Sequence, residues 1–190
     1  MIPDGPNELT ELNKIMSDFS KVMQNELEKM WSAKLGLKSF DANLFQPLIN
    51  LMIETKVDYT IFFRELSHLP KDIRPLKISF YGETSKNLDQ KWEKWLMNWH
   101  EVLTTENDGN LSDVSKKMTL TNPKYTFREW LVVSAYNQAE KGDYSLVREL
   151  QEVLASPYEE QSKDIEAKFY RLKPKAYFNT GGISHYSCSS

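Results

Sequence analysis

Apolar residues recur at spacings of three and four over most of this 190-residue chain, and this periodicity constrains the fold more than any other feature. It is longest near the amino terminus, where it predicts one amphipathic helix from Asn7, the expected N-cap, to a stop at Gly36. Its apolar positions are Leu9, Leu12, Ile15, Met16, Phe19, Val22, Met23, Leu27, Met30 and Trp31. The sequence has no sustained period-two alternation and no Asn-Gly hairpin signal. We therefore predict an all-α fold.

Three further helical segments are predicted before residue 110. One follows Asp41, although Pro47 would remove a backbone hydrogen bond unless it lies in the first turn. Asp58 is expected to cap a short helix that ends before Pro70 and Pro75. A third apolar stripe begins near residue 88 and ends at the turn-rich residues 106–110. The side chains expected to face inward are Leu44, Leu48, Leu51, Met52, Tyr59, Phe62, Phe63, Leu66, Leu69, Leu88, Trp92, Trp95, Leu96, Trp99 and Leu103.

The clearest helix signals lie in residues 121–143, with the sequence TNPKYTFREWLVVSAYNQAEKGD. We predict Asn122 as N-cap, Pro123 as the first helical residue and Gly142 just past the end. Asp143 should cap a second, antiparallel helix that stops at residues 156–157. The side chains expected to stabilise the first helix are Phe127, Trp130, Leu131 and Ala135 or Tyr136. The prediction is an irregular bundle of six or seven helices over residues 1–174, followed by a polar, flexible tail over residues 175–190.

Composition excludes several classes of partner. The 24 Lys and Arg against 27 Asp and Glu give a net charge of −3, so no general attraction to nucleic acid or anionic lipid is expected. No apolar run approaches the about 18 residues of a membrane span, and the first residues lack the pattern of a signal peptide. A single cysteine cannot form an internal disulfide, which suits a reducing compartment. We expect a soluble protein with neither nucleic-acid nor membrane partners.

The sequence offers no recognisable metal or nucleotide site. His68, His100 and His185 lie far apart, and Thr104 stands where a zinc-protease helix beginning at His100 needs its second histidine. In a calcium-loop alignment of residues 104–115, Thr104 and Ser115 replace the terminal carboxylates. No glycine-rich phosphate loop follows a strand. We therefore predict no catalytic, cofactor-binding or metal-binding residue in these 190 residues.

Two patterns allow a functional as well as a structural interpretation. Trp92, Trp95 and Trp99 share a helical face that could stack on a base or sugar, but their spacing favours core packing or a domain-docking face. The adjacent Arg and Glu at residues 64–65 and 128–129 could be catalytic pairs, but surface or interhelical ion pairs explain them better. Both patterns are expected to be structural.

Several segments in register resemble the selenoprotein O (SelO) family of pseudokinase-fold protein adenylyltransferases. The family has an Asn-Pro-x-x-x-x-Arg motif, an Ala-Glu-x-Gly-Asp-Tyr/Phe corner and a Pro-Tyr/Phe turn, which correspond here to residues 122–128, 139–144 and 157–158. The segments KLGL (residues 34–37) and DYTIFFRELS (residues 58–67) also match family segments in order and spacing. The resemblance covers nearly the whole chain.

The resemblance implies a function for the complete family protein. There, a kinase-like domain that binds ATP and magnesium precedes this region and transfers AMP to Ser, Thr or Tyr of protein substrates. These 190 residues contain no glycine-rich loop, no strand lysine paired with a helix glutamate, no Asp-Phe-Gly motif and no catalytic-loop aspartate. We therefore expect a C-terminal fragment, or the product of a split or truncated gene, that is inactive alone and has the kinase-like domain as partner. Family members are cytoplasmic in bacteria and mitochondrial in eukaryotes.

Cys188, the third residue from the carboxyl terminus, is the one candidate site residue. In the family this position holds selenocysteine or cysteine and is proposed to form a redox link to the kinase-like domain. An exposed cysteine without function is the plain alternative, and a thiol redox protein using Cys188 alone lacks a resolving cysteine. For the chain as a whole, the alternative function is an independent helical protein-interaction module.

Overall fold

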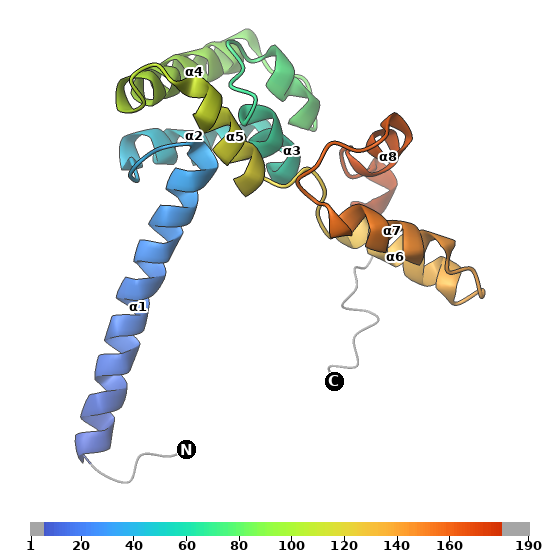
Figure 1. Cartoon of the computed structure of the whole chain (residues 1–190), viewed down its shortest axis with the longest axis horizontal. Coiled ribbons are helices and arrows are strands. Elements are labelled where there is room, and N and C mark those ends of the chain that lie inside the picture. The colour runs from blue at the N-terminus through green and yellow to red at the C-terminus, as the bar shows by residue number, and fades with distance from the viewer. Residues whose placement is uncertain (1–5, 180–190) are drawn as a thin grey trace.

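The structure is a computed structural model that describes residues 6–179, and within this range it is all-α, as predicted (Figure 1). Strand pairing in the described residues is limited to one isolated bridge between Val57 and Phe80. The helices are α1 (Pro6–Leu35), α2 (Ala42–Thr55), α3 (Tyr59–Leu66), η1 (Arg74–Ser79), α4 (Lys86–Glu106), α5 (Leu111–Thr121), α6 (Glu129–Ala139), α7 (Ser145–Ala155), α8 (Lys163–Phe169) and η2 (Lys175–Tyr177). Helices α5 and α8 lie where the apolar pattern predicts no helix, so the described residues contain more helices than the predicted six or seven.

The first hydrophobic core lies among the end of α1 and helices α2 to α5, which we call the first lobe. The predicted tryptophan stripe of α4 forms its centre, and all three indoles are nearly inaccessible to water. Their N–H groups donate 2.9 Å hydrogen bonds to the Oγ1 of Thr55 and to the carbonyl oxygens of Leu44 and Leu35. Each bond satisfies a donor that burial would otherwise leave unpaired. These tryptophans are core residues, which confirms the core-packing interpretation, and their burial leaves no face for a base, a sugar or another domain.

A second, separate core is formed by α6, α7 and α8, which we call the second lobe (Figure 1). Helices α6 and α7 run antiparallel and are joined at Gly142, whose φ of +83° favours glycine. Trp130, Leu131 and Ala135 of α6 are buried as predicted. Of the alternatives Ala135 and Tyr136, Ala135 is therefore the buried one, whereas Phe127 is 66% exposed against expectation. The predicted helical hairpin is therefore confirmed, but its buried face is narrower than expected.

The predicted helix start at Asn122 is wrong. Asn122 is the C-cap of α5, with extended backbone angles, and α6 begins seven residues later at Glu129. The side chain of Asn122 donates to the carbonyl oxygen of Lys34 and to Ser67 Oγ, both at 3.0 Å. Two amides of the following loop donate to the carbonyl oxygen of Pro157. These tertiary bonds hold the loop and the Asn122 side chain in positions that an N-cap role would not allow.

Three other helix boundaries agree with the local signals, and the start of α1 does not. Gly36 ends α1 with a φ of +72°, and Asp41 and Asp58 cap α2 and α3 by accepting backbone N–H groups. Pro47 lies inside α2, beyond its first turn. Asn7 lies within α1, one residue after its first residue, so the predicted N-cap is misplaced.

Candidate interaction surface and interlobe junction

Helix α1 carries a long apolar face that the rest of residues 6–179 leaves uncovered. In Figure 1 the helix projects far from the two lobes and joins the first lobe only at its carboxyl-terminal end. There Trp31 and Leu35 contact the first core. We define the α1 apolar face as Leu9, Leu12, Ile15, Met16, Phe19, Val22, Met23, Leu27 and Met30, whose exposed fractions range from 37% to 69%. A contiguous apolar surface of this extent is typical of an interaction site.

The spacing of this face suits a helical or flat apolar partner. Leu9, Leu12, Met16, Phe19 and Met23 alternate steps of three and four, the pattern of a coiled-coil seam. Fully burying a side chain of this kind contributes about 1.5–3 kcal/mol. Covering even part of the face would therefore stabilise a complex substantially.

The position of Lys34 shows on which side of α1 the face lies. Lys34 follows Met30 by four residues and Leu27 by seven, so the helical period places it on the same side. Its amine donates a 2.8 Å hydrogen bond to Oδ1 of Asn122, where α5 ends and the chain continues to the second lobe. The amine also lies 5.0 Å from the ring centre of Tyr59, and burial lowers its pKa. The α1 apolar face is thus on the side from which the second lobe extends.

The two lobes are joined by a buried polar junction centred on Arg64. This side chain is 1% exposed and donates to the carbonyl oxygens of Thr119 and Asn122 at 3.0 and 3.3 Å. Its other terminal nitrogen donates a 2.7 Å bond to Glu160, in the segment between α7 and α8. Arg64 therefore ties α3 both to α5 and to the second lobe.

Lys124 completes this cluster from the loop before α6. Its amine is 2.5 Å from Glu160 Oε2 and 3.3 Å from Glu166 Oε1. Burial opposes ionisation of Glu160, but the hydrogen bonds from Lys124 and Arg64 outweigh burial, so the pKa of Glu160 is lowered. Burial likewise disfavours the charged form of Lys124, yet its carboxylate partners raise its pKa. Both shifts favour the charged forms of Glu160 and Lys124.

A second ionic contact lies between α3 and the start of α6. Arg128 donates two hydrogen bonds, of 2.7 and 2.9 Å, to the carboxylate of Asp58, which also accepts from the hydroxyl of Tyr81. Nearby, the hydroxyl of Tyr170 donates a 2.7 Å hydrogen bond to Glu65. Burial is the larger cause, and the negative charge of Glu65 the smaller cause, of the raised pKa of Tyr170. The arginines of both Arg-Glu pairs are therefore interlobe structural groups, as the ion-pair interpretation predicts.

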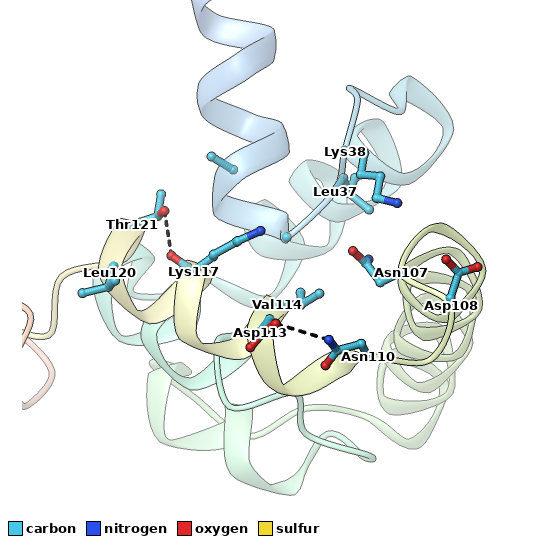
Figure 2. A pocket seen from close by; sticks show the side chains of 12 residues that line it. Leu37, Lys38, Asn107, Asp108, Asn110, Asp113, Val114, Lys117, Leu120 and Thr121 are labelled. Carbon is cyan, nitrogen blue, oxygen red and sulfur yellow. Dashed lines mark hydrogen bonds between the residues drawn. The ribbon is translucent and has the colours of Figure 1, made fainter.

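A pocket of about 630 Å³ lies where α1 ends against α5 (Figure 2). Figure 2 shows side chains of both charges around it, including Lys38, Lys117, Asp108 and Asp113. At its edge the backbone of Gly36 approaches α5 so closely that an added Cβ would lie 2.6 and 2.7 Å from side-chain atoms of that helix. The lining is mixed in charge and indicates no class of ligand.

The predicted site residue Cys188 lies outside the described residues, as does His185. His100 lies against the first core, with Nε2 2.8 Å from the carbonyl oxygen of Pro70.

Residues 6–179 bring together no group of three or more His, Cys, Asp or Glu that could hold a metal ion. Within the same range, no helix is both long and apolar enough to cross a membrane. Sequence signals single out neither Lys124 nor Glu160, and they do not indicate the interlobe role of Asp58.

Comparison with known proteins gives one consistent family. The family model described as "Protein adenylyltransferase SelO" matches residues 7–155. The chain is 34% identical to the protein nucleotidyltransferase YdiU of Flavobacterium johnsoniae over 97% of this chain and 37% of that protein. It is 33% identical to the protein of the same name from Aromatoleum aromaticum, over 90% of this chain and 34% of the relative. The chain thus spans about a third of the length of these curated relatives.

Proposed function

Because this chain belongs to the SelO family of protein nucleotidyltransferases, we propose that it is the helical region that supports the kinase-like part of a protein adenylyltransferase. In this proposal the complete enzyme transfers AMP from ATP to Ser, Thr or Tyr of protein substrates, and these 190 residues do not carry out the transfer. The observation that carries the proposal is the α1 apolar face, which the lobes of this chain leave uncovered.

The kinase-like part is the expected partner because the relatives are much longer than this chain. About two thirds of each relative lies beyond its match to this chain, so the family provides a large body that is absent from these residues. Stable interfaces within one protein bury apolar surface like that of α1. The junction around Arg64 would then hold the second lobe against the first, and the hydrogen bonds between Lys34 and Asn122 would hold the end of α1 beside it.

ATP and magnesium, which the family implies, do not fit the residues described. Metal-assisted transfer of a phosphorus group needs carboxylates for the metal and free cations for the phosphates. Residues 6–179 show no three-ligand acidic or histidine cluster. The buried cations Arg64, Lys124 and Arg128 are each neutralised by carboxylates. We therefore assign this chain a structural and regulatory role, with no step of the transfer placed on its residues.

The regulatory part of the proposal concerns Cys188. Its thiolate would form a disulfide with a thiol of the kinase-like part by exchange with a small disulfide such as oxidised glutathione, which leaves as two reduced molecules. The bond would tether the carboxyl terminus to the catalytic part under oxidising conditions. Incubation of the complete enzyme with oxidised glutathione should then link the carboxyl terminus to the kinase-like part, and Cys188→Ser should abolish this cross-link.

Binding in trans tests the main proposal. The region of the Flavobacterium johnsoniae protein outside its match to this chain is produced separately and titrated with the chain in a calorimeter, with the relative's own matching third as positive control. We expect binding by the unaltered chain and its loss in Phe19→Glu, because burying a charge without a partner is unfavourable. Lys21→Glu, which changes charge away from the apolar face, is the matched control. Equal binding by both variants would refute the role of α1.

An independent protein-interaction module is the second candidate, and the same exposed face supports it. It predicts that the chain does not bind the catalytic region of the relative, although the relative's own matching third does. It shares with the first candidate the expectation that incubation with ATP and magnesium adds no AMP mass to the chain. A covalent gain of one AMP, measured by intact-mass spectrometry, would contradict both.

A further inference from the structure

A second apolar surface lies in the second lobe, on the outer side of the α6–α7 hairpin. It is a groove of about 620 Å³, within the range of about 300–1,000 Å³ that is usual for binding pockets. Its lining residues are Phe127, Val132, Ala135, Tyr136, Ala139, Tyr144, Val147, Leu150, Gln151, Leu154 and Ala155. Gln151 is the one lining residue that is neither aliphatic nor aromatic, and none is charged.

Aromatic rings stand at the rim of this groove rather than in the core beneath it. Phe127, Tyr136 and Tyr144 are 66%, 47% and 54% exposed. Rings at the edge of an apolar groove are typical anchors for a bound peptide, because they bury a large area with little loss of conformational freedom. The groove is separate from the α1 apolar face, which belongs to the other lobe.

We propose that this groove binds the chain's own carboxyl-terminal segment, residues 180–190. The segment has the composition that the groove requires. It contains no Lys, Arg, Asp or Glu, and its two large apolar residues, Ile183 and Tyr186, are three positions apart. A segment without Lys, Arg, Asp or Glu enters an uncharged groove without the cost of removing such a side chain from water.

The last described residues bring the chain to the correct helix. The hydroxyl of Tyr177 lies 3.1 Å from Ser134 Oγ on α6, and its ring centre is 5.8 Å from that of Trp130. Neither Ser134 nor Trp130 lines the groove, and the helical period places both on the opposite side of α6. The segment therefore has to pass around α6 to reach the groove.

The segment is also long enough to reach any part of the groove. At about 3.3 Å per residue, its eleven residues span up to about 36 Å, whereas α6 is about 17 Å long and about 10 Å wide. Docking would place Cys188 beside the second lobe and so limit which thiols it meets. The inference concerns this chain alone and does not depend on a catalytic partner.

The unique cysteine provides a direct test. A nitroxide spin label is attached to Cys188, and amide signals of the ¹⁵N-labelled chain are compared before and after reduction of the nitroxide. We expect loss of signal from groove residues such as Val132, Ala139 and Tyr144, with signals of α2 and α4 unaffected. Uniform broadening, or none at all, would overturn the proposal.

Variants in the segment separate specific docking from chance proximity without altering the folded lobes. The double substitution of Ile183→Ser and Tyr186→Ser should restore the groove signals, whereas Ser184→Ala should leave the broadening unchanged. Broadening that persists in the double variant would refute docking through these side chains. A mixture of spin-labelled ¹⁴N chain with ¹⁵N Cys188→Ser chain should show no broadening, and broadening there would assign the segment to a second copy and overturn the proposal.

Discussion

Glu160→Gln is expected to destabilise the protein although the carboxylate lies partly in water. The two cations that Glu160 neutralises are almost fully buried, with side-chain exposures of 2% for Arg64 and 5% for Lys124. The two cations donate to different oxygens of Glu160, so glutamine removes the charge and also replaces one of the two acceptors by an NH2 donor. The cost therefore arises from leaving buried positive charges without their principal counterion.

The magnitude follows from the geometry of the junction. Breaking a fully buried ion pair by removing one partner costs about 3–5 kcal/mol. Glu160 itself is 59% exposed, so solvent screening reduces its interaction with both cations, and Glu166 remains 3.3 Å from Lys124. We expect Glu160→Gln to lower the free energy of unfolding by about 2–3 kcal/mol.

The assay is urea denaturation followed by tryptophan fluorescence, with Glu159→Gln as the matched control. Glu159 is the adjacent exposed residue and carries the same charge, but it is not part of the junction. We expect its substitution to change the free energy of unfolding by no more than about 0.5 kcal/mol. Equal effects of the two substitutions would show that the junction does not depend on the Glu160 charge, and the reasoning would be refuted.

Three further predictions concern stability. Because the pKa of Glu160 is lowered in the folded state, the Glu160 carboxylate stabilises the fold above its ordinary pKa of about 4.3, and this stabilisation is lost as the pH falls through the lowered value. The free energy of unfolding should therefore depend less on pH in the acid range in Glu160→Gln than in the unaltered chain. Gly36→Ala should cost about 3 kcal/mol, from left-handed strain and overpacking against α5, whereas Gly142→Ala, with open space around its Cβ, should cost about 1 kcal/mol in the same urea assay. Trp130→Ala should cost about 3–5 kcal/mol because the ring is 6% exposed, and Phe127→Ala, whose ring is 66% exposed, should cost clearly less in the same assay.

Features set by neighbouring residues could be predicted from the sequence. Capping preference, the conformational freedom of glycine and apolar periodicity predict the Asp58 cap, the stop at Gly36 and the inward face of α4, and the structure shows all three. The Asn122 cap was also predicted from local signals, but there the bonds from α1 and α3 determine the conformation. Local propensity is a weak prior where tertiary hydrogen bonds compete with it.

The junction could not be predicted from the sequence in the same way. Arg64 and Glu160 are 96 residues apart, and nothing near Glu160 distinguishes it from the other acidic residues around it. The α1 apolar face is an intermediate case, because periodicity predicts the amphipathic helix but cannot show that its own chain leaves the face open. The separation of the two cores is likewise visible only in three dimensions.

Amide hydrogen exchange along α1 tests the central claim most directly. The chain is measured alone and in the presence of the Flavobacterium johnsoniae region outside the match. Because the lobes leave residues 9–30 uncovered, their amides should exchange faster in the isolated chain than those of α4, whose inner face is buried. Added partner should slow exchange along residues 9–30, and Phe19→Glu should remove this protection. Protection confined to the two lobes, with α1 unchanged, would contradict the account.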